Sequence, residues 1–250
     1  SVPLIASSIM AKKIVMGTKT VVIDVKCGEG SLLKDEVQAE KLATLMVNIG
    51  KMAGINTTAI LSNLDQPLGR SIGPMLETRE ALKLLNGDVE LFDSDLYNMC
   101  KERVKSRQTA GEMFDEVIAN KSAYKKLREM VKAHGGDTFA FDDLDSLIPP
   151  VNTIFVIADK AGFVANVDTL GLYQAINVIG ATESGEINRY VGLDILVREG
   201  DRIKEGDKLA KIYYSITDPN FASAVTCIRK CFNIGKTRPE LNPLIKKIIF

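Results

Sequence analysis

The chain has 250 residues, of which 46% are hydrophobic and 26% charged, a composition typical of a folded protein rather than a disordered one. Its 32 basic and 32 acidic side chains cancel, and no apolar run approaches the roughly 20 residues that span a bilayer, so neither nucleic acid nor a membrane is expected as a partner. One histidine and four cysteines, none in a CxxC pair, argue against a zinc site and a disulfide scaffold, and we expect a soluble cytoplasmic protein.

The first quarter of the chain predicts a helix followed by a strand–helix–strand unit. Pro3 suits the first turn of a helix over residues 3–16. Residues 20–26 form a β-branched run that predicts a buried strand, and residues 35–54 carry apolar side chains at helical spacing. A second strand is predicted over residues 56–61. Strand, helix and strand in succession favour a parallel sheet with a right-handed crossover.

The rest of the chain predicts a helical stretch and then a β-rich end. The expected helices cover residues 75–85, 89–105, 109–119 and 123–133. After Pro149-Pro150 come short strands and two helices, at residues 153–158, 162–167, 168–180, 194–197 and 219–232. The fold class is therefore α/β: the portion of a parallel-sheet α/β domain over 1–148, and a small β-rich, barrel-sandwich-like domain over 149–250.

Residues 198–212 contain a doubled turn, Glu-Gly-Asp-x-Ile-Lys-Glu-Gly-Asp-x-Leu-Ala-Lys-Ile. It resembles the turn of biotinyl and lipoyl carrier modules, which expose a modified lysine at a hairpin tip. Asp159-Lys160-Ala161 matches one such tripeptide, but it lies at the wrong place relative to the turn. We interpret the segment as a structural end domain.

Two polar residues of the first predicted helix are candidates for binding a ligand. Ser8 and Lys12 are four residues apart, so they lie one turn apart on one helix face. A hydroxyl beside an ammonium can hold a carbonyl oxygen and a neighbouring ring nitrogen. The spacing is SxxxK and not the SxxK of penicillin-binding enzymes, so it gives no support to an acyl-enzyme. Spacing alone favours the plainer interpretation of a solvated face ending at Lys13.

Residues 24–30, Asp-Val-Lys-Cys-Gly-Glu-Gly, place two glycines between a strand and a long helix. Such a layout can bind phosphate on backbone amides. The segment has neither the GxGxxG nor the GxxxxGK[ST] pattern, so it indicates no nucleotide-binding loop. A tight turn between strand and helix is an alternative of at least equal weight.

Taken in order, these motifs resemble the thymidine and pyrimidine-nucleoside phosphorylase family. The resemblance runs along nearly all of the chain. The residues that carry it are 4–13 (Leu-Ile-Ala-Ser-Ser-Ile-Met-Ala-Lys-Lys), 24–30, 66–73 (Gln-Pro-Leu-Gly-Arg-Ser-Ile-Gly), 77–81 (Glu-Thr-Arg-Glu-Ala), 130–137 (Met-Val-Lys-Ala-His-Gly-Gly-Asp) and the doubled turn with Val191-Gly192 before it.

The resemblance implies reversible phosphorolysis of a pyrimidine nucleoside, with inorganic phosphate as co-substrate and no organic cofactor. It places Ser8 and Lys12 on the pyrimidine edge and Ile5 on an apolar wall. There Lys12 would stabilise the negative charge that develops on the departing base. The family's apolar pair over the base, typically Phe-Met, falls on Leu32 and Leu33. The wall stays apolar but changes shape, which leaves the preference between thymine and uracil open.

The resemblance also implies a site for a monovalent cation and further segments of the protein before Ser1. Some bacterial members bind a monovalent cation such as K⁺ through backbone carbonyls and one glutamate, and the matching positions are Leu68, Ser71 and Glu80, with Ser71 in place of an alanine. The family's N-terminal helical domain, which makes most of the homodimer contact, its phosphate loop and an arginine on the base would all precede Ser1. We therefore expect a C-terminal portion of a phosphorylase that is a homodimer at full length.

Three alternatives stay open at this point. The chain could be a non-catalytic homologue that binds a base or nucleoside, a purely structural end piece, or part of a phosphorylase of nucleoside monophosphates. Binding of thymine or uracil separates the structural piece from the others, and phosphate-dependent turnover separates an enzyme from a binding protein.

Overall fold

The computed structural model describes residues 1–92, 94–105, 111–180, 188–214 and 221–250. The chain forms two compact units: unit 1 comprises Ser1–Asp65, Asn98–Glu112 and Asn242–Phe250, and unit 2 comprises Gln66–Tyr97 and Met113–Leu241. Each unit therefore collects segments that are far apart in the sequence. The sequence pattern predicts one division of the chain, between residues 148 and 149, and that division stays a prediction.

Unit 1 is built on a parallel pair of strands. β1 (Thr20–Cys27) and β2 (Asn56–Asn63) pair in parallel and are connected by α2 (Glu36–Met52), so the predicted strand–helix–strand unit is confirmed. α1 (Val2–Val15) precedes this unit in the chain. β10 (Ile245–Ile249) pairs antiparallel with β2 and completes the order β1-β2-β10. β10 is not predicted from the sequence, because a short apolar run at the chain end gives no sign of its distant partner strand.

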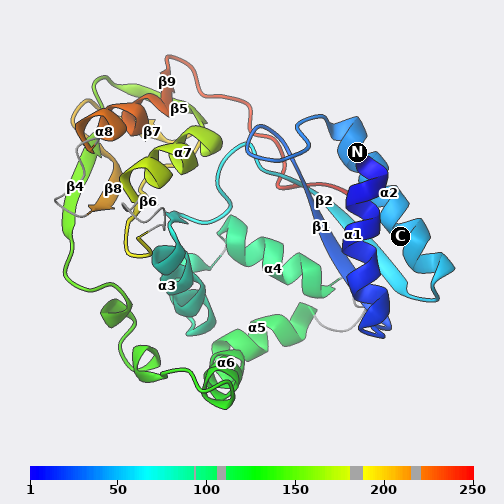
Figure 1. The fold of residues 1–250 in the computed structure, drawn as a ribbon. Helices are drawn as coiled ribbons and strands as arrows, with labels where there is room; N and C mark the ends of the chain where they lie inside the picture. The colour runs from blue at the N-terminus through cyan, green and yellow to red at the C-terminus, as the bar shows by residue number, and fades with distance from the viewer. Residues whose placement is uncertain (93, 106–110, 181–187, 215–220) are drawn as a thin grey trace. The chain divides into compact units, whose positions relative to one another are not determined.

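The core of unit 1 lies between its helices and its sheet. α1 and α2 lie side by side at the blue end of the chain (Figure 1), and Ala6, Met10 and Met46 have no exposed surface. α2 begins at Asp35, whose carboxylate accepts the N–H of Val37 at 3.0 Å. Such a cap satisfies one of the amides that the first helical turn leaves without a partner.

Unit 2 begins with a short strand and a helical region. Its sequence continues through β3 (Ser71–Ile72), α3 (Pro74–Leu85) and η1 (Val89–Leu91). α4 (Asp95–Lys105) and α5 (Gly111–Ala119) each have residues in both units. The helical region ends with α6 (Ser122–Ala133), η2 (Phe139–Phe141) and η3 (Leu144–Leu147).

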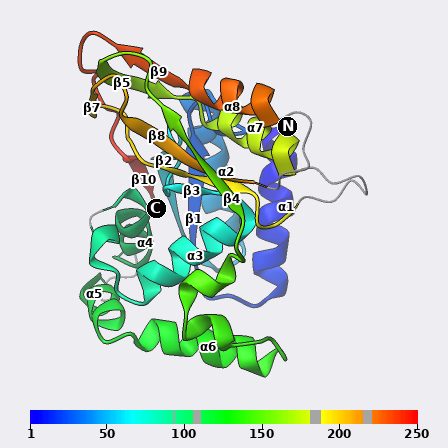
Figure 2. The same ribbon diagram turned by 90° about the vertical axis from the view of Figure 1, so that its left-hand side faces the viewer.

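The rest of unit 2 is β-rich, as the sequence predicts. Among the described residues, β3, β6 (Gly192–Ile195), β8 (Lys208–Tyr214) and β4 (Asn152–Ile157) form one antiparallel sheet. β7 (Arg202–Ile203), β5 (Gly162–Val167) and β9 (Phe232–Gly235) form another. α7 (Thr169–Gly180) and α8 (Phe221–Lys230) lie side by side in both views of the ribbon (Figures 1 and 2). The α/β class with a β-rich C-terminal region is therefore confirmed.

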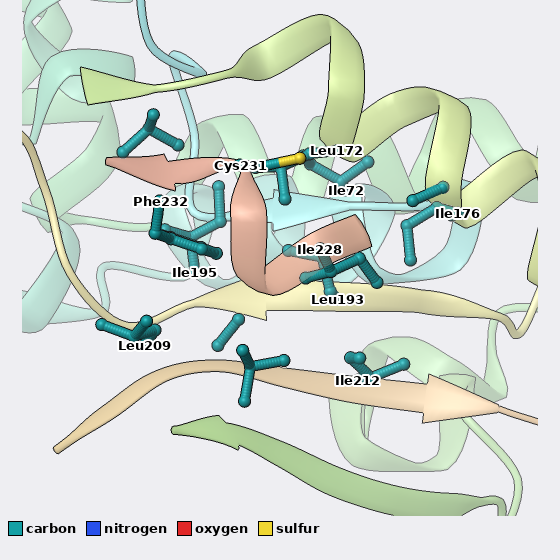
Figure 3. Packing of buried hydrophobic residues seen from close by; sticks show 14 of the residues in the cluster. Ile72, Leu172, Ile176, Leu193, Ile195, Leu209, Ile212, Ile228, Cys231 and Phe232 are labelled. Carbon is teal, nitrogen blue, oxygen red and sulfur yellow. The ribbon is translucent and has the colours of Figure 1, made fainter. Parts of the chain in front are cut away.

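Both sheets and both of these helices contribute to one buried apolar cluster. Leu172 of α7, Leu193 of β6, Ile212 of β8 and Ile228 of α8 are fully buried in it. Figure 3 shows these side chains gathered between the strands and the helices. Because every element supplies part of the cluster, the β-rich region of unit 2 has a continuous core.

Two predicted helices differ from the structure. The single helix expected over 89–105 is divided into η1 and α4, and the hydroxyl of Ser94 accepts the N–H of Tyr97 at 3.1 Å near the start of α4. The helix expected over 219–232 ends at Lys230, and its first two residues lie outside the described ones. Phe232 instead begins β9 opposite Val167, because strand pairing there buries its ring.

The position of Lys160 agrees with a structural role for the end domain. Lys160 lies in an exposed bend between β4 and β5. These two strands belong to different sheets, so the bend is not the tip of a hairpin. No helix within the described ranges is both long enough and apolar enough to cross a bilayer.

The contribution of the unit 2 core to stability can be tested by substituting two leucines that lie three residues apart, one buried and one exposed. Replacing the fully buried Leu193 with alanine should lower the free energy of unfolding by about 2–5 kcal/mol, because it removes apolar contacts and leaves a cavity. Leu196→Ala, at a side chain that is 40% exposed, should cost about 1 kcal/mol or less. Urea unfolding followed by circular dichroism measures both, and equal losses would contradict this description of the core.

Candidate functional site

The outer face of α1 presents the two polar side chains predicted to bind the base. Ser8 and Lys12 are both exposed, and their spacing puts them on the side of the helix opposite the buried Ala6 and Met10. Lys12 lies in the last turn of α1, where the negative end of the helix dipole favours a positive charge. The structure therefore brings a hydroxyl and an ammonium together on a surface that a small molecule can reach.

The three apolar candidates divide between the core and the solvent. Ile5 and Leu33 are half-buried, and both pack against the same buried cluster of unit 1. Leu32 is 84% exposed. The structure thus gathers Ile5 and Leu33 on one cluster but leaves Leu32 in solvent, where a substitution changes the surface without disturbing the core.

The glycine-containing turn after β1 is closed by the protein's own groups. The amide of Glu29 donates to Asp65 Oδ1 at 3.1 Å, and the amide of Gly30 donates to the carbonyl of Leu64 at 3.0 Å. Gly28 has φ 120°, and a Cβ at this position would overlap the Asp65 carboxylate. Of the two interpretations open from the sequence, the tight turn is the one these contacts support.

A buried carboxylate in unit 1 organises a polar cluster that the sequence analysis missed. The side chain of Asp24 is 7% exposed; it forms an ion pair with Lys26 at 2.8 Å and another with Arg103, and it accepts a hydrogen bond from the hydroxyl of Ser62. Lys26 also donates to the Ser62 hydroxyl at 3.0 Å. The only nearby sign of this cluster in the sequence is an aspartate two residues before a lysine in the same strand. Arg103 could not be paired with Asp24 from the sequence, since it lies 79 residues further along the chain.

The partners of Asp24 decide its charge. Burial by itself raises the pKa of the Asp24 carboxyl, but the hydrogen bonds from Lys26, Ser62 and Arg103 and the charge of Lys26 outweigh it. The pKa therefore lies below its ordinary value of 3.8. At neutral pH the cluster holds one carboxylate between two cations.

A second polar cluster, in unit 2, surrounds the loop of residues 66–71. Both carboxylate oxygens of Glu80 accept backbone amides of this loop, from Arg70 at 2.7 Å and from Ser71 at 3.1 Å. Glu80 is 8% exposed. A Cβ at Gly69 would overlap the carboxylate, so glycine is what lets the loop approach it closely.

On the carbonyl side of the same loop lies Arg198. Its guanidinium donates to the carbonyl oxygens of Pro67 and of Leu68, the latter at 2.7 Å from Nη2. Asp95 lies 3.9 Å from Nη2, and the Arg198 side chain is 14% exposed. Burial lowers the pKa of this guanidinium, and Asp95 partly offsets the effect. An arginine in a protein nevertheless keeps its charge at neutral pH.

The hydroxyl of Ser71 makes a hydrogen bond that an alanine at this position could not make. It donates to Asp194 Oδ1 at 2.7 Å, while Arg79 and Tyr213 each donate to Asp194 Oδ2 at 2.9 Å. Burial by itself lowers the pKa of Arg79, but the hydrogen bond with Tyr213 and the charge of Asp194 outweigh it and raise the pKa above its ordinary value. A cavity of about 420 Å³ adjoins these groups, lined in part by Ser71, Arg79, Glu80 and Asp194.

The structure thus brings the predicted cation ligands together, because Leu68 and Ser71 lie in the loop and Glu80 of α3 accepts two of its amides. Each of them is engaged there through hydrogen bonds to other parts of unit 2. Within the described part of the chain, no three His, Cys, Asp or Glu side chains are grouped so that they could hold a metal ion. Arg198 and Asp194 were missed by the sequence analysis, since both lie more than 100 residues from the loop they contact.

Comparison with curated proteins finds pyrimidine-nucleoside phosphorylases among the relatives of this chain. The chain is 36% identical over 224 residues to the pyrimidine-nucleoside phosphorylase of Bacillus subtilis (strain 168), a match that covers 85% of this chain and 52% of the relative. The proteins of the same name from Geobacillus stearothermophilus and Staphylococcus aureus (strain USA300) are 35% and 34% identical, over 85% and 87% of this chain and 52% and 53% of the relatives. The chain therefore spans about half the length of the relatives it matches. No family model matches the chain.

The charge cluster around Asp24 predicts a pH dependence of stability. A carboxyl whose pKa is lowered in the folded state stabilises the protein above its ordinary pKa of 3.8, and that contribution is lost as the pH falls through the folded pKa. Asp24→Asn should therefore lower the free energy of unfolding by about 1–3 kcal/mol at pH 7. The difference from the unaltered protein should shrink below about pH 4.

Urea unfolding at pH 7, 5 and 3 measures this difference. Asp159→Asn, at an exposed bend, provides the control and should leave the stability unchanged at each pH. An Asp24→Asn deficit that stays the same from pH 7 to pH 3 would show that the carboxylate charge is not what the cluster depends on.

Proposed function

The chain belongs to the pyrimidine-nucleoside phosphorylase family, and we propose that it carries the base-binding residues of an enzyme that cleaves pyrimidine nucleosides with phosphate. The products are the free base and a pentose 1-phosphate, and the reaction is reversible. The observation that carries the proposal is the pair of exposed side chains on α1, Ser8 and Lys12, at the positions where the family motif places its base contacts.

The proposed role of Lys12 follows from where charge develops. When the bond between the sugar and the base breaks, its electron pair stays on the base, which becomes negative. An ammonium placed at the base edge interacts more strongly with this anion than with the neutral substrate, and such a difference lowers the barrier. The hydroxyl of Ser8 can donate to a base carbonyl or accept from a ring N–H, so it fixes the orientation of the base.

The proposed role of phosphate is that of the nucleophile. Its oxygen forms a bond to the anomeric carbon as the bond to the base breaks, and the sugar passes through an oxocarbenium-like state. Positioning of the two reactants supplies much of the rate in such a reaction. The turn at Gly28–Gly30 is not the phosphate site in this proposal, since its amides donate to Asp65 and Leu64.

The apolar residues complete the base site. We propose that Ile5, Leu32 and Leu33 border the ring of the base, which has apolar faces and a polar edge. A pocket of this kind combines apolar walls with a few placed polar groups. At full length we propose a homodimer, as the family resemblance implies.

The first test removes the ammonium. Lys12→Ala should lower kcat for phosphate-dependent release of uracil or thymine by about 10²–10³-fold, the effect of losing one preorganised donor. Lys13→Ala, at the next residue of the same helix, is the matched control and should stay within a few-fold of the unaltered protein. Circular dichroism checks that both variants remain folded.

The same assay decides among the alternatives. Release of base that requires phosphate supports the enzyme, and calorimetric binding of uracil or thymine without turnover indicates a binding protein. Turnover that is unchanged in Lys12→Ala would contradict the role given to this lysine. Turnover of nucleoside 5′-monophosphates in preference to nucleosides would assign the chain to the nucleotide-specific alternative.

A second test concerns the choice between thymine and uracil. Leu32→Phe places a bulkier aromatic side chain at the proposed wall, which should leave less room for the 5-methyl group of thymine. The ratio of kcat/KM for thymidine over deoxyuridine should fall by up to about tenfold, the effect of about one methyl group in an apolar pocket. Val37→Phe, at another exposed apolar residue of unit 1, should leave the ratio unchanged.

A further inference from the structure

The loop of residues 66–71 has two kinds of backbone group to satisfy, and the protein supplies a charged partner for each. Its amides at Arg70 and Ser71 donate to the Glu80 carboxylate. Its carbonyls at Pro67 and Leu68 accept from the Arg198 guanidinium. The loop is therefore held between an anion on one side and a cation on the other, both from unit 2.

Arg198 is held in place by its own surroundings. The N–H of Arg198 donates to Asp201 Oδ2 at 2.7 Å, and the N–H of Gly200 donates to the carbonyl of Val164 at 2.8 Å. The next residue, Glu199, donates its N–H to the side-chain oxygen of Gln66 at 3.2 Å, at the start of the loop. The turn that carries Arg198 is thus tied to β5 and to the loop, so the backbone from which its side chain reaches the carbonyls is fixed.

The guanidinium suits the two carbonyls better than a monatomic ion does. Its planar fork places two N–H donors side by side, which matches the consecutive carbonyl oxygens of Pro67 and Leu68. A metal ion at the same place needs oxygens that point to one centre. Here the Leu68 oxygen already accepts a hydrogen bond, and both Glu80 oxygens are directed to amides.

The positive charge of Arg198 also disfavours a cation bound at the loop. A monovalent cation that used the Leu68 carbonyl would lie beside the Arg198 guanidinium, whose side chain is 14% exposed. Two positive charges at that separation repel each other strongly where water does not screen them. The donor set at Leu68, Ser71 and Glu80 therefore does not fit a resident monovalent cation in this chain.

We propose that Arg198 is a built-in cation that takes the place of the monovalent ion expected at Leu68, Ser71 and Glu80. The loop that leads from β2 into α3 is fixed by this side chain, and its position does not depend on K⁺. This inference is independent of the proposed function. It concerns how unit 2 is held together, and its test measures the unfolding temperature of the protein and not its activity.

The test compares thermal unfolding in KCl with unfolding in choline chloride at equal ionic strength. The unaltered protein should unfold at the same temperature in both salts. Arg198→Ala should unfold several degrees lower in choline chloride, and K⁺ should recover part of that loss by entering the vacated place. Arg202→Ala is the matched control, since Arg202 is an exposed arginine of the same doubled turn, and it should behave as the unaltered protein in both salts.

Two results would overturn the proposal. One is a saturable rise in the unfolding temperature of the unaltered protein with K⁺ that choline does not produce. The other is an Arg198→Ala variant as stable as Arg202→Ala in choline chloride. If Arg198→Ala cannot be obtained folded, calorimetric titration of the unaltered protein with Tl⁺, a K⁺ substitute, decides: saturable binding overturns the proposal, and its absence supports it.

Discussion

Burying a charged side chain is unfavourable by several kcal/mol unless partners replace the lost water, and both polar clusters of this protein are organised by that constraint. In unit 1 the Asp24 carboxylate is matched by Lys26, Ser62 and Arg103. In unit 2 the Arg198 guanidinium is matched by two backbone carbonyls. Asp24 connects side chains of β1, β2 and α4, and Arg198 connects its own turn to two carbonyls of the loop. In each case the position of the surrounding backbone depends on the buried charge.

The two clusters and the candidate base site have different structural demands. The central charges of the two clusters, on Asp24 and Arg198, are largely buried and paired within the protein, so they serve the fold. Ser8 and Lys12, in contrast, lie exposed on a helix whose other side is firmly packed through Ala6 and Met10. A rigid helix that presents polar groups to solvent is suited to binding, because the groups are positioned before a ligand arrives.

The relationship to pyrimidine-nucleoside phosphorylases gives these features a context. The chain matches about half the length of those relatives, and the match covers 85% of the chain itself. At the loop of residues 66–71, the carbonyl of Leu68, one of the predicted cation ligands, accepts a hydrogen bond from Arg198. The proposed use of Arg198 in place of an ion is a local feature of one loop, and a relationship across 85% of the chain allows such a difference.

What the sequence determined by itself was the local part of this protein: β1, α2 and β2, and the placing of Ser8 and Lys12 on one face of α1, since these depend on residues a few positions apart. What only the tertiary structure decided was every feature that joins distant segments. β10 pairs with β2 across most of the chain, Arg103 reaches Asp24 over 79 residues, and Arg198 reaches Leu68 over 130. Local periodicity reports which side of an element is buried, whereas the partner of a buried charge is set by the path of the whole chain.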